Sequence, residues 1–98
     1  MPFFSVKKVM ATILKEYNLA DTIDICKVFS AWNTIVGERI ADHTKPVRVT
    51  DHILYVEVDD PLWLAQMKYM KGEILCKVED MVKKDVIRDI RFFLHHVS

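Results

Sequence analysis

The feature that most constrains the fold of this chain is a long apolar repeat with helical spacing. Between about Thr22 and Asp42 the apolar side chains recur at intervals of three and four residues: Ile25, Val28, Phe29, Trp32, Ile35, Val36 and Ile40. Because this spacing lines one side of an α-helix, the segment predicts a single amphipathic helix with one buried face. Pro46 ends this helix, because a proline pushes the residue before it out of helical geometry.

Three segments predict the strands against which that helix packs. Residues 47–50 and 53–58 alternate apolar and polar side chains and are joined at Asp51-His52, and the last strand is predicted at Val86–Leu94. Period two turns one face of each strand toward the core and the other toward solvent. The inward sets are Val47 and Val49, then Leu54, Val56 and Val58, and finally Val86, Ile90, Phe92 and Leu94.

Two more helices complete the predicted fold. Ser5 can cap the first, which runs to about Tyr17 and is followed by a turn with a cap at residues 18–21. The other helix begins at Asp59-Asp60-Pro61, where a carboxylate caps it and proline occupies a position that needs no amide hydrogen. It runs to about Lys84. Its buried seam is Trp63, Met67, Met70, Ile74, Val78 and Met81. The order α-α-β-β-α-β predicts an α+β fold, with a three-stranded sheet, helices packed on one face, and the other face partly open.

The composition predicts one globular domain spanning residues 1–98. Hydrophobic residues make up 51% of the chain, and a chain of this length can bury one modest core. Basic and acidic residues number 14 each, so any binding of nucleic acid must use a local patch. We expect a cytoplasmic protein without membrane contact, because the chain lacks a signal peptide and any apolar run of about 20 residues. Cys26 and Cys76 are expected to be buried, reduced thiols.

No group of residues in the sequence predicts catalysis or metal binding. The four histidines, His43, His52, His95 and His96, lack the spacing of zinc ligands. The acidic pair Asp59-Asp60 precedes Pro61 and is explained as a helix cap. No phosphate-binding glycine loop and no nucleophile motif occurs. We therefore expect a binding protein without a cofactor or metal, rather than an enzyme.

Two lysines on the third predicted helix are candidates for binding a partner. Lys68 and Lys71 lie one turn apart and have no acidic neighbour three or four residues away. They are therefore expected to be free to hold a phosphate or a partner's carboxylate, with Lys7, Lys8 and Arg48 as further cations of the same site. The competing interpretation is that they only solvate the helix.

The outward face of the sheet is a second candidate surface. It is expected to show Arg48, Tyr55, Arg91 and Phe93 beside Glu57 and Asp89. Arginine beside an exposed aromatic ring can neutralise and stack single-stranded nucleic acid. The two acids weaken that interpretation, so a protein contact ranks above nucleic acid on this face.

Four motifs in consistent order resemble those of the DciA family. The run from Trp32 to Pro46, WNTIVGERIADHTKP, resembles the family's W-x-x-IVG-x-x-IA-x-HT-x-P signature. The other three are Leu54–Val58, similar to an L-x-V-x-V strand, Pro61–Met67, similar to a W-x-x-(Q/E)-L helix opening, and Ile90–Phe92, similar to a closing I-R-F strand. The likeness covers about residues 22–93.

The resemblance implies a bacterial protein that assists loading of the replicative helicase onto DNA. It also implies a K-homology-like fold and contacts with single-stranded DNA and the helicase hexamer. Many members carry a long flexible tail that contributes to helicase contact, whereas this chain stops four residues after Leu94. Residues 37–40 do not supply the GxxG loop by which nucleic-acid-binding K-homology domains clamp a backbone.

Physical chemistry gives the motif mainly structural roles. Gly37 is expected to permit a close approach, while Thr44 and Pro46 end the helix and start the strand. Trp32 and Trp63 are assigned to the core, because tryptophan among aliphatic residues at helical spacing is usually buried. The structural motif comprises Trp32, Gly37, Ile40, His43, Thr44, Pro46 and Trp63.

The sequence leaves two main hypotheses for function. The first is a non-catalytic replication adaptor that binds the helicase and weakly binds single-stranded nucleic acid. The alternative is a protein–protein interaction module, or a homodimer formed through the open sheet face or edge, without nucleic-acid binding. An enzyme with a dispersed site would need a deep pocket gathering His43, Cys76 and an acid.

Overall fold

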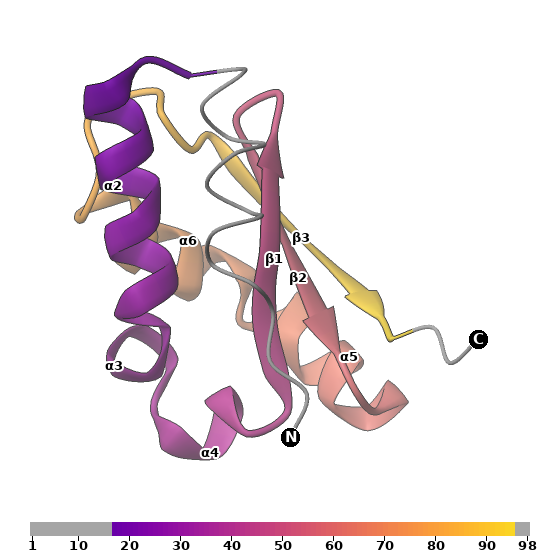
Figure 1. The fold of residues 1–98 in the computed structure, drawn as a ribbon. Coiled ribbons are helices and arrows are strands. Elements are labelled where there is room, and N and C mark those ends of the chain that lie inside the picture. Colours follow the sequence, from indigo (N-terminus) through magenta and orange to yellow (C-terminus); the bar gives the residue numbers. More distant parts are fainter. Residues whose placement is uncertain (1–16, 96–98) are drawn as a thin grey trace.

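The computed structural model describes residues 17–95 and shows helices beside a three-stranded sheet (Figure 1). β1 (Thr44–Thr50) pairs antiparallel with β2 (Ile53–Val58), and β2 pairs parallel with β3 (Asp89–Leu94). The helices are α2 (Leu19–Ser30), α3 (Trp32–Val36), α4 (Glu38–Ala41), α5 (Pro61–Tyr69) and α6 (Lys71–Glu79). The predicted α+β class and the three-stranded sheet are therefore confirmed.

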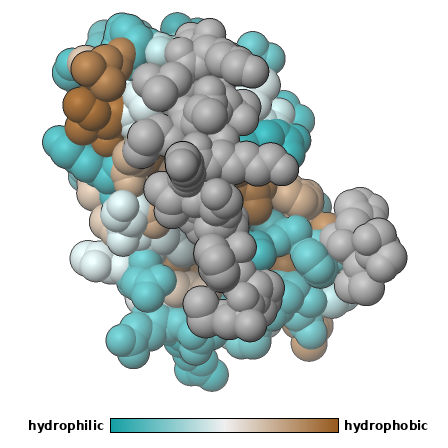
Figure 2. Space-filling model, viewed as in Figure 1, coloured by the Kyte–Doolittle hydropathy of each residue, from teal (hydrophilic) through white to brown (hydrophobic). Residues whose placement is uncertain are grey.

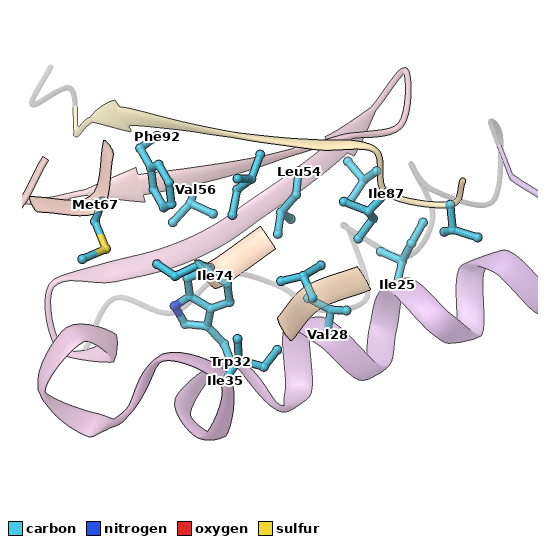
Figure 3. Close-up of a cluster of buried hydrophobic side chains, with 14 of the residues drawn as sticks. Ile25, Val28, Trp32, Ile35, Leu54, Val56, Met67, Ile74, Ile87 and Phe92 are labelled. Carbon is cyan, nitrogen blue, oxygen red and sulfur yellow. The ribbon is translucent and has the colours of Figure 1, made fainter. Parts of the chain in front are cut away.

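The hydrophobic core lies between one face of the sheet and the helices (Figure 3). Its largest fully buried side chains are Ile25, Val28, Val49, Leu54, Val56, Val58, Met67, Ile74, Val78, Ile87 and Ile90. Within residues 17–95, the helices are gathered on that side of the sheet (Figures 1 and 3). The opposite face therefore carries no helix from this part of the chain.

The helix predicted at residues 22–42 is divided into α2, α3 and α4. It begins earlier than predicted, at Leu19, because the Oδ1 atom of Asn18 accepts the Asp21 N–H at 2.8 Å and caps α2. The cap predicted within residues 18–21 is therefore confirmed, whereas the turn predicted there is wrong, because α2 already begins at Leu19. Gly37 separates α3 from α4 with φ +90° and ψ 153°, a backbone conformation that essentially only glycine adopts.

Gly37 is required for its backbone conformation and not for the close approach that we expected. A Cβ atom placed on Gly37 would meet nothing within 4 Å, and the same is true at Gly72. The left-handed φ at Gly37 turns the chain so that α4 can lead into β1. The single long helix was predicted from spacing alone, and spacing does not detect this backbone requirement.

The third predicted helix, residues 61–84, is also divided and ends earlier. α5 and α6 meet at Met70, and α6 ends at Glu79. β3 begins at Asp89 rather than at the predicted Val86, after a segment in which Asp85 has φ +69°. Of the predicted inward set, Ile90 and Phe92 are buried within β3, Val86 is buried but precedes the strand, and Leu94 is 39% exposed.

β1 is longer than predicted and contains a bulge. It begins at Thr44, and the register with β2 shifts between Pro46 and Arg48. Val47 is therefore an extra, half-buried residue, and its predicted inward position opposite β2 is wrong. Asp51 and His52 both have positive φ and form the two-residue turn between β1 and β2, as antiparallel hairpins require.

Two side chains tie the α2 end of the fold to distant loops. The Tyr17 hydroxyl accepts the His52 N–H at 2.8 Å, and the buried Asp24 carboxylate accepts the Lys83 N–H at 3.0 Å. The helix predicted at residues 5–17 lies outside the described residues, apart from Tyr17. None of the helices in residues 17–95 is long and apolar enough to cross a membrane.

Candidate functional site

A row of two arginines and a tyrosine crosses the face of the sheet that no helix of residues 17–95 covers. Tyr55 on β2 is the register partner of Arg48 on β1 and of Arg91 on β3. The Arg48 guanidinium carbon lies 4.2 Å from the centroid of the Tyr55 ring, which is a cation–π contact. Both arginines are exposed. The structure thus brings together three residues that the alternation of the strands placed on this face.

The two acids on the same face each have a lysine as an ion-pair partner. Glu57 lies 3.5 Å from the Lys45 Nζ atom and also contacts the His95 ring, with Nδ1 2.6 Å from Oε1. Asp89 lies 3.0 Å from the Lys71 Nζ atom. Within residues 17–95, Arg48 and Arg91 form no ion pair. The row therefore presents cations whose charge the neighbouring acids do not satisfy by direct pairing.

Lys71 is not the free cation that the sequence predicted. Its partner Asp89 is distant in sequence and is brought to it by the return of the chain into β3. The hydrogen bond from Lys71 lowers the pKa of Asp89, assisted by the Ile90 N–H and the charges of Lys71 and Arg91, while partial burial opposes the shift. Lys71 therefore helps to fix the edge of the sheet beside Arg91.

We expect Lys71→Ala to raise the pKa of Asp89 toward its ordinary value, because the largest cause of the lowering is removed. Carboxyl NMR titration of the two proteins measures this. Since the folded-state pKa is lowered, the stabilisation exists above the unfolded pKa and is lost as pH falls through the folded one. Lys77→Ala on α6 is the matched control. An unchanged Asp89 titration in Lys71→Ala would contradict the pairing.

The remaining predicted cations do not join the row in the described part of the chain. Lys68 is exposed on α5 and forms no ion pair with residues 17–95. Lys7 and Lys8 lie outside the described residues. Phe93, also predicted on this face, is half-buried and pairs in register with Glu57.

The first half of the sequence motif forms a buried hydrogen-bonded joint. Trp32 is 3% exposed, and its Nε1–H donates to the Thr44 hydroxyl at 3.0 Å. That hydroxyl in turn donates to the Ile40 carbonyl at 2.9 Å. The joint connects α3, the end of α4 and the start of β1, where Pro46 is also buried. These contacts position the motif inside the fold rather than at a reactive surface.

The second half of the motif forms a stacked pair nearer the surface. The His43 ring stacks on Trp63 with centroids 4.7 Å apart, and its Nδ1 atom lies 3.1 Å from Asp59 Oδ1. Trp63 is only half-buried, so its assignment to the core is corrected: it packs against the core and lines a surface hollow. Asp60 caps α5 as predicted, accepting the Leu62 N–H at 2.8 Å.

Within residues 17–95 no group of three or more histidine, cysteine or acidic side chains could hold a metal ion. Cys26 is half-buried, and burial raises its thiol pKa. Cys76 is exposed, so its predicted burial is wrong. Within residues 17–95, neither thiol has a hydrogen-bonded histidine.

Sequence reasoning missed two features of the surface. The first is the pairing of Glu57 with Lys45 and His95. The register of β1 against β2 would have indicated Lys45, whereas His95 follows the end of β3. The second is a pair of very exposed apolar side chains on α5, Leu62 and Tyr69. Both residues lie off the predicted buried seam of that helix, which was the available signal.

Comparison with known proteins places these observations in a family. The model of the family described as "Dna[CI] antecedent, DciA" matches residues 5–92. A UPF0232 protein of Mycobacterium tuberculosis (strain H37Rv) is 31% identical over 64 residues, which is 65% of this chain and 34% of the relative. A UPF0232 protein of Rhodococcus jostii is 30% identical over 79 residues, covering 81% of this chain and 42% of the relative.

This chain therefore spans less than half the length of these curated relatives. The family match, in contrast, extends over most of the chain and includes the Trp32–Pro46 motif, the β2 strand, the start of α5 and most of β3. The chain belongs to the DciA family.

Proposed function

We propose that this protein is a non-catalytic adaptor in bacterial DNA replication, acting in the cytoplasm to assist loading of the replicative helicase. Membership of the DciA family supports this role. The described surface supports a binding function, because it presents two exposed arginines in one row with a tyrosine. We also propose that residues 1–98 form one domain.

The nucleic-acid contact of this adaptor is proposed on the row Arg48–Tyr55–Arg91. The observation that carries it is that both acids on this face are paired with other cations, whereas the two arginines are not. The guanidinium groups can pair with phosphates, and the Arg48–Tyr55 stack offers a planar surface to an unpaired base. The acids that ranked protein above nucleic acid at the level of sequence are therefore less of an obstacle.

We expect Arg48→Glu/Arg91→Glu to weaken binding of single-stranded DNA at least about tenfold at low salt, because two phosphate contacts become repulsive. Fluorescence anisotropy of a labelled oligothymidylate, measured over a series of salt concentrations, tests this. The slope of log affinity against log salt should fall by about 1.4, since each phosphate contact on a single strand contributes about 0.7.

Lys77→Glu/Lys84→Glu is the matched control for this experiment. Both lysines are exposed, both lie away from the row in sequence, and the double change alters net charge equally. It should leave affinity within about threefold of wild type, because only long-range attraction is affected. Equal losses in the two double variants would show that net charge, not the row, governs binding, and absence of wild-type binding at low salt would remove the nucleic-acid part of the proposal.

An apolar surface on α2 favours a second candidate function, a homodimer or protein-only interaction module. Leu19 is 67% and Ile23 is 48% exposed, and they line a hollow of about 640 Å³ with Cys26, Ala31 and Met81. Figure 2 shows hydrophobic surface gathered over α2 at the upper left. Sizing wild-type protein at two concentrations, with and without DNA, separates this alternative from the adaptor.

A further inference from the structure

α5 presents an uncharged stripe that nothing in residues 17–95 covers. Leu62, Ala65, Gln66 and Tyr69 are spaced i, i+3, i+4 and i+7, so they lie on one face of the helix, and all four are exposed. Leu62 is 82% exposed and Tyr69 is 88% exposed. These are the two most exposed large apolar side chains in the described part of the chain, and they occur on a single face.

A hollow of about 420 Å³ borders this stripe. It lies between α4 and α5 and is lined by Arg39, Ile40, Leu62, Trp63, Gln66 and Met70. Its wall is held in place from behind, because Trp63 stacks on His43, which contacts Asp59. A side chain entering the hollow would therefore meet a preformed and mainly apolar surface, as ligand and peptide grooves usually do.

Two of the charges beside the stripe are cations, one of them in the lining of the hollow. Arg39 on α4 and Lys68 on α5 are exposed, and neither forms an ion pair with residues 17–95. The acids at the start of α5 are already engaged, since Asp60 caps the helix and Asp59 contacts His43. The stripe itself carries no carboxylate. A partner with carboxylates would complement these two cations.

We propose that the α5 stripe and its hollow bind an acidic amphipathic helix of the replicative helicase, an inference that rests on the proposed adaptor function. A helix laid along α5 can place apolar side chains against Leu62 and Tyr69 and a further apolar side chain in the hollow. These contacts have the i, i+3, i+4 and i+7 spacing with which amphipathic helices bind grooves. Its flanking carboxylates pair with Arg39 and Lys68. The stripe belongs to α5, which follows the end of β2 (Figure 1), whereas the arginine row belongs to the three strands. The two proposed contacts therefore use different side chains.

We expect Leu62→Ser/Tyr69→Ser to weaken binding of the purified helicase hexamer from the same bacterium at least about tenfold, because exposed apolar anchors dominate such contacts. Biolayer interferometry with full-length proteins measures the dissociation constant. The control is Lys77→Ser/Glu79→Ser at two exposed positions of α6, which leaves the net charge unchanged and should change the dissociation constant less than about threefold. Binding of oligothymidylate should be unchanged in both variants, which shows that the sheet face remains folded.

A charge reversal tests the acidic character of the partner. Lys68→Glu should weaken helicase binding about three- to tenfold, and more at low salt, whereas Lys77→Glu on α6 should not. If wild type binds helicase and all these variants bind equally well, the α5 site is wrong and the adaptor function stands. If wild type binds no helicase, the adaptor function itself fails. A concentration-dependent dimer abolished by Leu62→Ser/Tyr69→Ser would overturn the proposal in favour of a second copy.

Discussion

Replacing Trp32 by alanine should lower the free energy of unfolding by about 3–5 kcal/mol, the usual range for deleting a large buried aromatic side chain. Trp32 is 3% exposed and is surrounded by core side chains from the sheet and helices (Figure 3). Its indole also closes the joint through Thr44 to the Ile40 carbonyl. Urea denaturation followed by circular dichroism measures the change, with a constant slope as the sign of two-state unfolding.

Two companion variants separate packing from hydrogen bonding at this position. Thr44→Val keeps the shape but leaves the buried indole N–H without its acceptor, at a cost of about 1–3 kcal/mol. Trp63→Ala removes a half-buried ring and should cost less than Trp32→Ala. If Trp32→Ala and Trp63→Ala proved equally costly, the distinction between a core and a surface tryptophan would be wrong.

The apolar spacing predicted which residues face the core better than it predicted where helices end. Ile25, Val28, Trp32 and Ile35 are buried, although they belong to two helices rather than one. Burial depends on side-chain direction, which changes little across the short break between α2 and α3 at Ala31. The break at Gly37 depends on one backbone angle, and no apolar pattern records it. The same holds for Asp85, whose positive φ precedes the late start of β3.

The residues of the candidate site that share a face of the sheet could be predicted from strand alternation. The ion pairs between residues distant in sequence could not. Arg48, Tyr55 and Arg91 were placed on one face by period two, and the register sets them in one row. Lys71 was predicted to be free because only its helical neighbours were considered, while its partner Asp89 comes from β3. Leu62 and Tyr69 lie off the predicted buried seam, so their exposure could have been predicted, although a residue opposite such a seam is normally polar.

The two glycines should respond to alanine in opposite directions. Gly37→Ala should destabilise the protein by about 1–3 kcal/mol, since φ +90° with ψ 153° is strained for any residue with a Cβ. Gly72→Ala in α6 should stabilise it by up to about 1 kcal/mol, because alanine has the higher helix propensity. Contacts with more distant parts of the chain contribute to neither value, since a Cβ at either position would meet no such atom within 4 Å.

Urea denaturation of the two variants beside wild type measures this difference, and the comparison isolates backbone conformation because the added methyl group is identical. A destabilising Gly72→Ala would show that α6 is not regular at that residue. A neutral Gly37→Ala would show that the turn between α3 and α4 relaxes into an ordinary conformation. The Trp32–Thr44 joint would then be formed without a strict geometry at Gly37, and the glycine of the motif would no longer be explained by the path of the chain into β1.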